Sequence, residues 1–373
     1  MKARYKRYRK KKKYFDEQNI HIIIYYGYKK FIFIILLFFI NNTFNSRIKN
    51  KYNYNTSNKY SNNSVHIAIN IDNKYIYPAI VYLTSLFDNR AKTTFYYINV
   101  LTNGKLGKNA TNKINYVVDK FGNNFVKIIY HNLGDDFKDA TEWHLPSYYK
   151  IALPSLLPNV DRIIFIDSDM INLEDLTEMY NFKFKEKVYF AGILDYINHL
   201  TQLRDFNLSS DKYINAGVLI MNLKAMREDS IEAKLREFVS NHTCIFWDQT
   251  AINCVCRNNI QNLPYKYNVF AFDQFYKLVE LNNHQKFQYK YTERQLKNFF
   301  EEPTNFHYVS LDKPWLRSTQ KFNRVYWWYY VKMSGFYKEI LDYYNFNYDE
   351  IESLLKQIPN DGGLLKRNYK IIY

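Results

Sequence analysis

The chain has 373 residues and a formal net charge of +16, a length that allows one large domain or two small ones. Residues 1–64 hold fifteen Lys or Arg and two acidic residues, whereas the remaining 309 residues hold 37 basic and 34 acidic ones. A nucleic-acid-binding domain concentrates positive charge on its folded part. A net charge of only +3 beyond residue 64 therefore argues against a nucleic-acid partner.

A basic and then apolar N-terminal segment predicts a membrane anchor. Nine of the first thirteen residues are Lys or Arg, and the mostly apolar stretch 20–40 follows, interrupted by Lys29 and Lys30. A helix that spans a bilayer needs about 20 predominantly apolar residues, and two lysines near its middle are costly. We interpret 20–40 as an uncleaved signal anchor, with a signal peptide whose apolar core is Phe31–Ile40 as the alternative.

These observations divide the chain into five parts. We expect a basic cytoplasmic tail at 1–19, the transmembrane anchor at 20–40, a low-complexity stem at 41–64, a folded domain at 65–317, and aromatic-rich C-terminal helices with a tail at 318–373. Such a single-pass type II protein places its folded domain in the lumen of the Golgi or the ER. Six N-x-[ST] sequons are compatible with that location: Asn41, Asn55, Asn62, Asn109, Asn207 and Asn241.

From residue 65 onward, strand patterns alternate with helix patterns. Strands are predicted at 65–71, 95–101, 126–129, 163–166, 189–194 and 213–222, and helices at 77–87, 109–120, partly at 147–157, at 232–239 and from 247. This alternation predicts an α/β fold with a single Rossmann-like, mostly parallel central sheet and flanking helices. Ligands of such sheets bind at the carboxyl ends of the strands, where Asp72 and Asp167 fall.

Two carboxylates follow the apolar strand Ile163–Ile166, in the order Asp167-Ser168-Asp169. Alternate side chains of an extended chain point to the same side, so Asp167 and Asp169 can share one ligand. A divalent cation between them would offset their repulsion. The alternative is that Asp167 caps the next turn and Asp169 is a solvated loop residue.

Four separated segments then occur in one order: I-D-S-D at 166–169, Y-I-N-A-G-V-L-I-M-N-L at 213–223, W-D-Q-T-A-I-N at 247–253 and H-Y-V-S-L-D-K-P-W at 307–315. Together they resemble glycosyltransferase family 8 over about residues 65–317. The phrase F-N-R-V-Y-W-W-Y-Y at 322–330 is similar to the branch of lipopolysaccharide glucosyl- and galactosyltransferases. The resemblance implies a GT-A type fold and a retaining, metal-dependent enzyme that uses nucleotide sugars.

The family pattern implies a metal site and a diphosphate site. It assigns Asp167, Asp169 and His307 as ligands of Mn²⁺, with Mg²⁺ as the alternative, a donor set that suits a hard divalent ion. Lys313 matches the family lysine on the diphosphate, where a positive charge stabilises the leaving group. Ser310 stands where the motif usually has Gly, a change that alters the approach of the backbone to the diphosphate but offers a hydroxyl that can donate to it. Without the motif, His307 would be interpreted as an ordinary histidine and Lys313 as a solvated lysine.

The resemblance also implies residues that contact the nucleoside and the adjoining part of the donor. Asp72 and Tyr75 match the residues that hold uracil and stack on it, and a plain core aromatic is the competing interpretation of Tyr75. Lys74 replaces a common Asn, which puts the fine detail of base recognition in question. Lys150 occupies the place of a family Arg or Lys and would contact the donor sugar or the phosphates.

Four further positions face the transferred sugar. Asn215, Asp195 and Asp248 match residues that form hydrogen bonds with donor-sugar hydroxyls. Gln249 matches the residue placed against the reacting carbon, on the face opposite the leaving group. Asp248 and Gln249 are also expected at a helix N-terminus, where an acidic residue suits the helix dipole.

The resemblance implies transfer of a hexose, with glucose or galactose favoured, from a UDP-sugar to a hydroxyl of a glycan or glycoconjugate. Gln249 is a poor nucleophile, so a front-face route fits better than a covalent sugar–enzyme intermediate. The alternative function is a catalytically inactive membrane protein that binds nucleotide sugars or glycans. Retention of the whole set Asp167, Asp169, His307 and Lys313 argues against that alternative.

The remaining expectations concern packing. Residues 322–337 predict one or two aromatic-rich helices that pack on the folded domain, with contact to a membrane surface as the alternative. Cys244, Cys254 and Cys256 show neither a disulfide framework nor a metal-binding spacing, and we expect buried or free thiols.

Overall fold

The computed structural model describes residues 63–134, 136–137, 145–195, 204–208, 212–244, 246–270, 302–309, 313–317 and 324–356, together with 292, 294–295 and 297–298. The predicted cytoplasmic tail, the predicted anchor at 20–40 and nearly all of the predicted stem lie outside these residues. Among the residues described, no helix combines the length and the apolar character that crossing a membrane requires.

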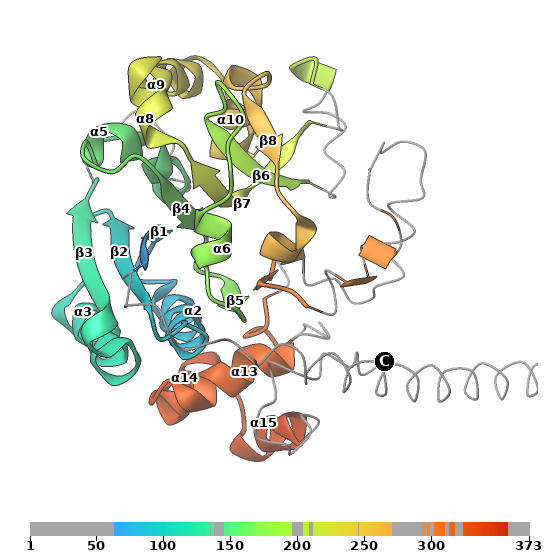
Figure 1. Ribbon diagram of the computed structural model, residues 1–373. Helices are drawn as coiled ribbons and strands as arrows, with labels where there is room; N and C mark the ends of the chain where they lie inside the picture. The colour runs from blue at the N-terminus through green and yellow to red at the C-terminus, as the bar shows by residue number, and fades with distance from the viewer. Residues whose placement is uncertain are drawn as a thin grey trace, which may run out of the picture. The chain divides into compact units, whose positions relative to one another are not determined.

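A seven-stranded sheet forms the centre of the domain, in the order β3-β2-β1-β4-β7-β6-β8 (Figure 1). Its strands are β1 (Asn63–Asn70), β2 (Thr94–Thr102), β3 (Val126–Asn132), β4 (Ile163–Ile166), β6 (Phe190–Leu194), β7 (Ile214–Met221) and β8 (Ile260–Asn262). β7 runs antiparallel to both of its neighbours, β4 and β6, whereas the other pairs are parallel. The prediction of one mostly parallel central sheet is therefore confirmed.

The strands at the centre of this sheet are apolar along their whole length because both of their faces are covered. Every residue of β4 and of β7 is buried. Alternate residues belong to two separate apolar clusters: Ile164 and Ile166 pack on one face, whereas Ile163 and Phe165 pack on the other. Continuous apolar runs are typical of strands that are buried on both faces.

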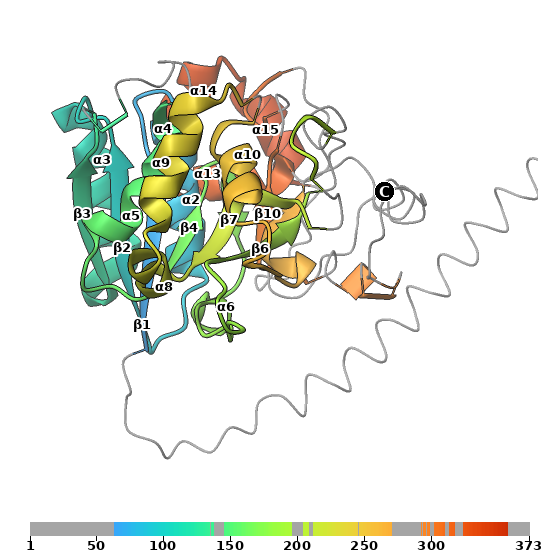
Figure 2. The same ribbon diagram turned by 90° about the horizontal axis from the view of Figure 1, so that it is seen from above.

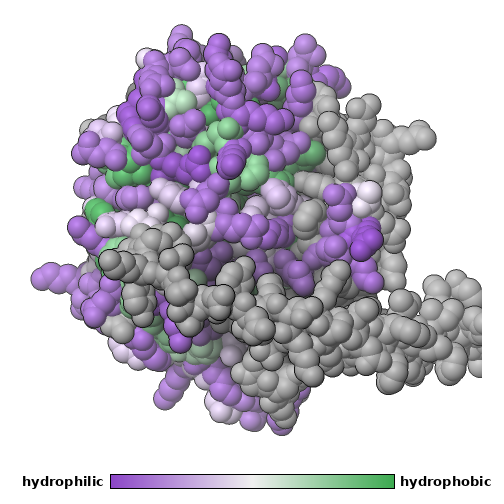
Figure 3. All heavy atoms as spheres, in the orientation of Figure 1, coloured by the Kyte–Doolittle hydropathy of each residue, from purple (hydrophilic) through white to green (hydrophobic). Residues whose placement is uncertain are grey.

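Helices form a layer on each face of the sheet (Figure 2). The first layer contains α2 (Ile76–Asp88), α3 (Lys108–Val117), α13 (Arg324–Met333), α14 (Tyr337–Tyr344) and α15 (Tyr348–Leu355). The second contains α4 (Leu145–Tyr148), α5 (Leu153–Leu156), α8 (Leu223–Glu228), α9 (Ile231–Asn241) and α10 (Trp247–Val255). On the face of the molecule drawn in Figure 3, hydrophilic residues predominate and hydrophobic ones occur in scattered spots.

A second, three-stranded sheet joins distant parts of the chain. Its order is β5-β10-β9, formed by β5 (Met170–Asn172), β10 (Asn305–His307) and β9 (Val269–Phe270). β10 runs antiparallel to β5, and this register sets His307 opposite Met170, one residue after Asp169. Backbone pairing between β5 and β10 thus places the predicted histidine ligand beside the predicted pair of carboxylates.

The aromatic C-terminal segment packs on the domain, as predicted. Trp327 and Trp328 on α13 are fully buried, and α13 contacts α2 (Figure 1). Gly335 has φ +89°, a left-handed conformation that favours glycine, and it separates α13 from α14. The rings of the two tryptophans therefore belong to the core, and they are too deeply buried to contact a membrane surface.

Helix boundaries differ from the expectations where the backbone departs from the α-helix. The helix expected at 109–120 ends as α-helix at Val117 and continues as a wider π-helical turn, Val118–Gly122. The partly helical segment expected at 147–157 consists of α4 and α5 with the 3₁₀ turn Tyr149–Ala152 between them. Proline at the second position of α5 is compatible with the start of a helix, where its missing N–H has no partner to lose.

Candidate active site

The candidate site lies at the edge of the sheet where the parallel strands end. Asp167 follows β4 directly, and its backbone N–H donates to the carbonyl of Gly217 on β7 at 2.8 Å. Asp169 ends the short turn before β5 and is 8% exposed. Because β7 runs antiparallel to β4, the start of β7, with Asn215, reaches this same edge. Strand direction therefore gathers carboxylates and amides that are far apart in sequence.

Asp167, Asp169 and His307 converge, with one ligand atom from each lying within 4.8 Å of the others. Nε2 of His307 is 3.5 Å from Oδ1 of Asp169 and 4.0 Å from Oδ2 of Asp167. The histidine ring is buried. Two carboxylate oxygens and one imidazole nitrogen fit a hard divalent cation such as Mn²⁺ or Mg²⁺, which accepts this donor set.

The electrostatics of the two carboxylates differ. Burial raises the pKa of Asp167 to about 6, and the charge of Asp169 acts in the same direction. Burial also acts to raise the pKa of Asp169, but the charges of Lys313 and His307 outweigh it and hold that pKa well below its usual range. Asp169 is thus already paired with a positive charge, whereas Asp167 is the carboxylate whose ionised form a cation would stabilise most.

Lys313 lies beside the carboxylates. Its Nζ is 2.5 Å from Oδ2 of Asp169 and donates to the carbonyl oxygen of Tyr308 at 2.7 Å. The ammonium group of Lys313, predicted to bind the diphosphate, is therefore within the site. Ser310, the other residue predicted for this function, lies outside the described residues.

Lys150 and Asp248 form a buried ion pair, with 2.7 Å between Nζ and Oδ2. Lys150 also donates to the carbonyl of Ala216 at 2.9 Å and lies 4.0 Å above the ring of Phe165. Burial raises the pKa of Asp248, and the charge of Lys150 opposes this shift. Lys150 was expected to contact the donor, and its ammonium group faces Asp248 and the β7 backbone.

The three remaining residues predicted for the sugar form one hydrogen-bonded cluster. Nε2 of Gln249 donates to Oδ2 of Asp195 at 2.8 Å, and Nδ2 of Asn215 donates to the same oxygen at 3.3 Å. Oε1 of Gln249 accepts from Nδ2 of Asn215 at 3.2 Å and from the backbone N–H of Ala216 at 3.0 Å. Gln249 lies on α10, Asn215 lies on β7 and Asp195 directly follows β6, and all three are buried.

Asp72 and Tyr75 occupy the turn between β1 and α2. Oδ1 of Asp72 accepts the backbone N–H groups of Lys74 at 2.9 Å and Tyr75 at 2.8 Å, a local turn that orients the start of α2. The Tyr75 ring meets Trp315 edge to face, 6.1 Å between centroids. Burial and then the charges of Asp169, Asp167 and Asp72 raise the pKa of Tyr75 well above its ordinary value. The side chain of Tyr75 is partly exposed.

Two positions at the site had no assigned function. Gly217 lets the ring of His307 approach closely: a Cβ at Gly217 would lie 2.3 Å from Cε1 of that ring. Asn268 is fully buried, and its carboxamide contacts both His307 and Asn215. It ends the segment L-P-Y-K-Y-N at 263–268, in which no site residue is predicted.

The three cysteines take no part in this site. All are buried and free, as predicted. Burial raises the pKa of Cys244 to about 11 and those of Cys254 and Cys256 to about 12. A thiol with so high a pKa is protonated near neutral pH and is a poor nucleophile.

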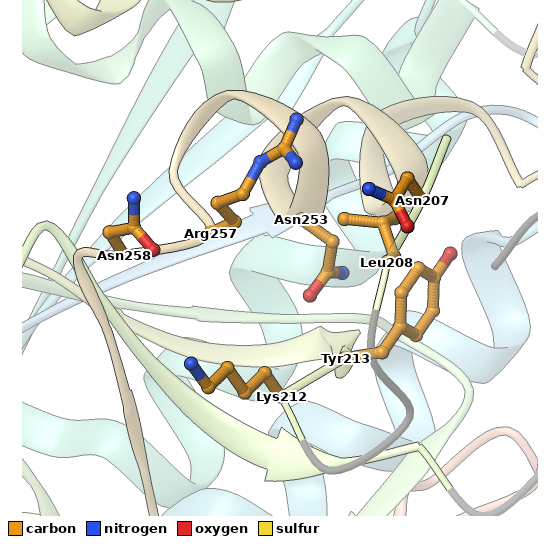
Figure 4. Close-up of a pocket in the computed structure, with 7 residues that line it drawn as sticks. All are labelled: Asn207, Leu208, Lys212, Tyr213, Asn253, Arg257 and Asn258. Atoms are coloured by element: carbon orange, nitrogen blue, oxygen red, sulfur yellow. The ribbon is translucent and has the colours of Figure 1, made fainter.

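A separate hollow of about 170 Å³ lies beside Tyr213 and Asn253 (Figure 4). Lys212 and Arg257 lie on opposite sides of it, and none of the site residues predicted from the sequence lines it. Asn253 uses its carboxamide to bind the backbone of Ile214 and Gln249. The hollow is thus a neighbour of the candidate site and not the site itself.

Comparison with known proteins agrees with this arrangement. The pattern of "Glycosyl transferase family 8" matches residues 66–319. General stress protein A of Bacillus subtilis is 23% identical over 192 residues, which cover 50% of this chain and 64% of that protein. Glycosyltransferase GlyF of Streptococcus pneumoniae is 24% identical over 268 residues, 71% of this chain and 60% of that protein. The chain thus spans less than two thirds of the length of these relatives.

Solved structures share the fold. The bifunctional glycosyltransferase WbbM has a TM-score of 0.63 at 19% identity, with 77% of this chain and 52% of that chain covered. The galactosyltransferase LgtC, solved with donor and acceptor sugar analogues, has a TM-score of 0.61 at 18% identity, with 73% and 95% covered. At these identities the likeness shows the fold alone, a GT-A-like α/β arrangement. With its family pattern matched over residues 66–319, this chain belongs to glycosyltransferase family 8.

Proposed function

We propose that this chain is a retaining hexosyltransferase that moves a sugar, with glucose or galactose favoured, from a UDP-sugar to a hydroxyl of a glycan or glycoconjugate. The observation that carries the proposal is the convergence of Asp167, Asp169 and His307 beside the ammonium group of Lys313. A divalent cation, Mn²⁺ by preference, would be held by the two carboxylates and the imidazole, and when bound it supplies positive charge for the diphosphate.

The residues of the chain have distinct functions in this proposal. Lys313 presents a positive charge at the place where negative charge grows on departing UDP. Asp72 and Tyr75 hold the uracil, and Asn215, Asp195 and Asp248 bind the sugar hydroxyls. Lys150 keeps Asp248 charged in a buried setting, because an unpaired buried carboxylate would take up a proton.

A front-face route fits the surroundings of Gln249. Its amide oxygen already accepts hydrogen bonds from Ala216 and Asn215, which lowers its capacity to attack the sugar. In the front-face route the oxygen of the leaving phosphate takes the proton of the acceptor hydroxyl while that hydroxyl forms the new bond on the same face. Gln249 then orients the sugar from the opposite face and forms no covalent bond.

Hydrolysis of a panel of UDP-sugars by the purified full-length chain tests the proposal. We expect release of UDP from one or two UDP-hexoses in the presence of Mn²⁺, with loss of the activity in a chelator and recovery on addition of metal. A product that keeps the anomeric configuration of the donor supports the retaining assignment. Turnover of no UDP-sugar, with binding preserved, would instead favour the inactive binding protein.

We also propose that the chain is a single-pass type II membrane protein with its catalytic domain in the lumen of the Golgi or the ER. The basic segment 1–19 followed by apolar 20–40 supports this orientation. The three sequons of the described domain, at Asn109, Asn207 and Asn241, are all exposed, so a glycosylating enzyme could reach them. Extraction with carbonate and protection of the domain from protease in sealed vesicles test the proposal; release into the soluble fraction would refute it.

A further inference from the structure

A buried carboxamide connects the predicted metal ligand to the residues predicted for the sugar. Asn268 ends the 3₁₀ turn Tyr265–Asn268 and is 0% exposed. Its Nδ2 donates to Oδ1 of Asn215 at 2.9 Å, and its Oδ1 lies 2.9 Å from Nδ1 of His307. A buried amide with both ends engaged can be oriented in only one way if one of its partners has a fixed polarity.

The polarity of Asn215 is fixed by the backbone. Its Oδ1 accepts the N–H of Gly217 at 2.9 Å, and a backbone N–H can only donate. Its Nδ2 faces two acceptors, Oδ2 of Asp195 and Oε1 of Gln249. The amide oxygen of Gln249 is fixed in the same manner, because it accepts the N–H of Ala216. Neither amide can be turned over without setting donor against donor.

The orientation of Asn268 follows from that of Asn215. The oxygen of Asn215 needs a donor, so Asn268 must present its NH₂ group there and its oxygen to His307. An amide oxygen at 2.9 Å from Nδ1 requires that Nδ1 carries the hydrogen. The lone pair of the neutral imidazole is then on Nε2, the nitrogen that faces Asp169 and Asp167 at 3.5 and 4.0 Å.

We propose that Asn268 is a positioning residue that holds His307 in the tautomer able to bind the cation, and that links this ligand to the sugar-binding residues through Asn215. The inference rests on the proposed function only in naming the site as one for a metal and a sugar. Hydrogen bonds from the second nitrogen of a metal-binding histidine commonly set its tautomer, and their loss weakens metal binding by about 10–100-fold.

The chain offers a matched control. Asn99 on β2 is also a buried carboxamide whose oxygen lies 3.0 Å from a ring nitrogen of a histidine, Nε2 of His131. Its Nδ2 donates to the carbonyl of Ile67, so both of its ends are engaged, as in Asn268. His131 belongs to β3, away from the three predicted ligands. Asn99→Leu therefore removes the same kind of bond at comparable burial without touching the site.

The first experiment needs no substitution. Selective ¹⁵N labelling of histidine in the metal-free full-length chain, recorded at a pH at which the ring is neutral, reports which ring nitrogen carries the hydrogen, with the His307 signal assigned from its loss in His307→Gln. We expect a single tautomer with the hydrogen on Nδ1. A His307 with the hydrogen on Nε2, or with both tautomers equally populated, overturns the proposal whatever the activity of the chain.

Two substitutions separate the two functions of Asn268. Asn268→Leu removes both contacts, so we expect Mn²⁺ binding, measured by electron paramagnetic resonance of the free ion, to weaken about 10–100-fold. Asn268→Asp keeps an acceptor toward His307 but sets an oxygen against the oxygen of Asn215. Here we expect Mn²⁺ affinity within about threefold of the wild type and a raised KM for the UDP-sugar, with the Nδ1-protonated tautomer retained.

The outcomes are distinct from those that test the transferase proposal. Wild-type Mn²⁺ affinity and an unchanged tautomer in a folded Asn268→Leu, as in the Asn99→Leu control, overturn the positioning function. If Asn268→Leu does not fold, a mixture of tautomers or a loss of Mn²⁺ affinity in Asn268→Asp does so. A chain that turns over no UDP-sugar but shows the expected tautomer and metal affinities refutes the transferase and leaves the function of Asn268 standing.

Discussion

Two buried regions join parts of this chain that are distant in sequence, and they do so by different forces. The C-terminal helices attach through rings: Trp327 lies 5.2 Å from Trp315 and 4.9 Å from Trp328, centroid to centroid. The candidate site instead joins the turn after β4, the start of β7, the 3₁₀ turn Tyr265–Asn268 and β10 through polar contacts such as that of Asn268 with His307. Apolar contact is non-directional, whereas each hydrogen bond has a donor and an acceptor that cannot be exchanged.

This difference has a consequence for substitution. A ring in the aromatic region can be replaced by another apolar group of similar size at small cost, because volume is what the core requires. In the polar region, replacing an amide NH₂ group by an oxygen turns a donor into an acceptor. The hydrogen bond is then lost, and the orientation of the next amide is no longer fixed. Stability should therefore depend mainly on the first region, and metal binding and turnover on the second.

The largest expected effect is on turnover. Asp169→Ala removes a predicted metal ligand and the partner of Lys313, so we expect the Mn²⁺-dependent hydrolysis of UDP-sugar to fall by at least about 10⁴-fold, about 5.4 kcal/mol. In Asp169→Asn, which keeps the shape of the side chain, the rate of hydrolysis should fall nearly as far. The control is Asp161→Ala at the other end of β4, where the side chain is 73% exposed. Full activity of either Asp169 variant would eliminate the metal assignment.

The second effect is on stability. Trp327→Ala opens a large cavity between α13, Trp315 and Tyr344, so we expect the free energy of unfolding to fall by about 3–5 kcal/mol in a denaturant titration. Tyr348→Ala, at a ring that is 56% exposed, should change it by less than about 0.5 kcal/mol. Equal losses in the two variants would contradict the assignment of Trp327 to the core.

An intermediate effect is expected where the polar region is most tightly packed. Gly217→Ala places a Cβ at 2.3 Å from Cε1 of His307 and at 2.9 Å from Oδ2 of Asp167, so these ligands must shift. We expect Mn²⁺ affinity to fall about 10–100-fold while the fold is kept. Gly107→Ala is the matched control, because a Cβ there meets nothing within 4 Å. Unchanged affinity in Gly217→Ala would show that the site tolerates the displacement.

The smallest effect concerns a polar cluster outside the site. Asp175 accepts from the backbone of Ala91 and Thr177 and from the hydroxyl of Tyr96. Burial acts to raise its pKa, but the hydrogen bonds from Thr177 and then Ala91 outweigh it and the net pKa is lowered. The stability it contributes is therefore present above about pH 4, the unfolded value, and is lost as pH falls toward the folded pKa.

Asp175→Asn should therefore cost about 1–2 kcal/mol at pH 7 and make the free energy of unfolding less dependent on pH below about 4. Unfolding curves recorded between pH 3 and pH 7 measure both. Turnover at pH 7 should be unchanged, because Asp175 contacts no residue of the candidate site among those described. A large loss of turnover with little loss of stability would link this cluster to catalysis.

Much of the fold could be predicted from the local pattern of residues. Ile163–Ile166 is apolar throughout because a central strand is covered on both faces, and this showed without any tertiary information. Asp167 and Asp169 were recognisable because the alternation of an extended chain sets them on one side. The distant motif around His307 and Lys313 identified their partners by resemblance, and backbone pairing of β10 with β5 brings them together.

The tertiary structure alone decided the rest. The sequence does not indicate the function of Asn268. The backbone N–H of Gly217 fixes the orientation of the Asn215 amide, and that amide in turn fixes the orientation of Asn268. Lys150 was identified by position, but only the fold shows its ammonium group paired with Asp248 and β7. A pattern of residue types reports burial and strand direction, which are local. The directions of donor and acceptor in a series of linked hydrogen bonds depend on several segments of the protein. They are determined only when the fold brings those segments together.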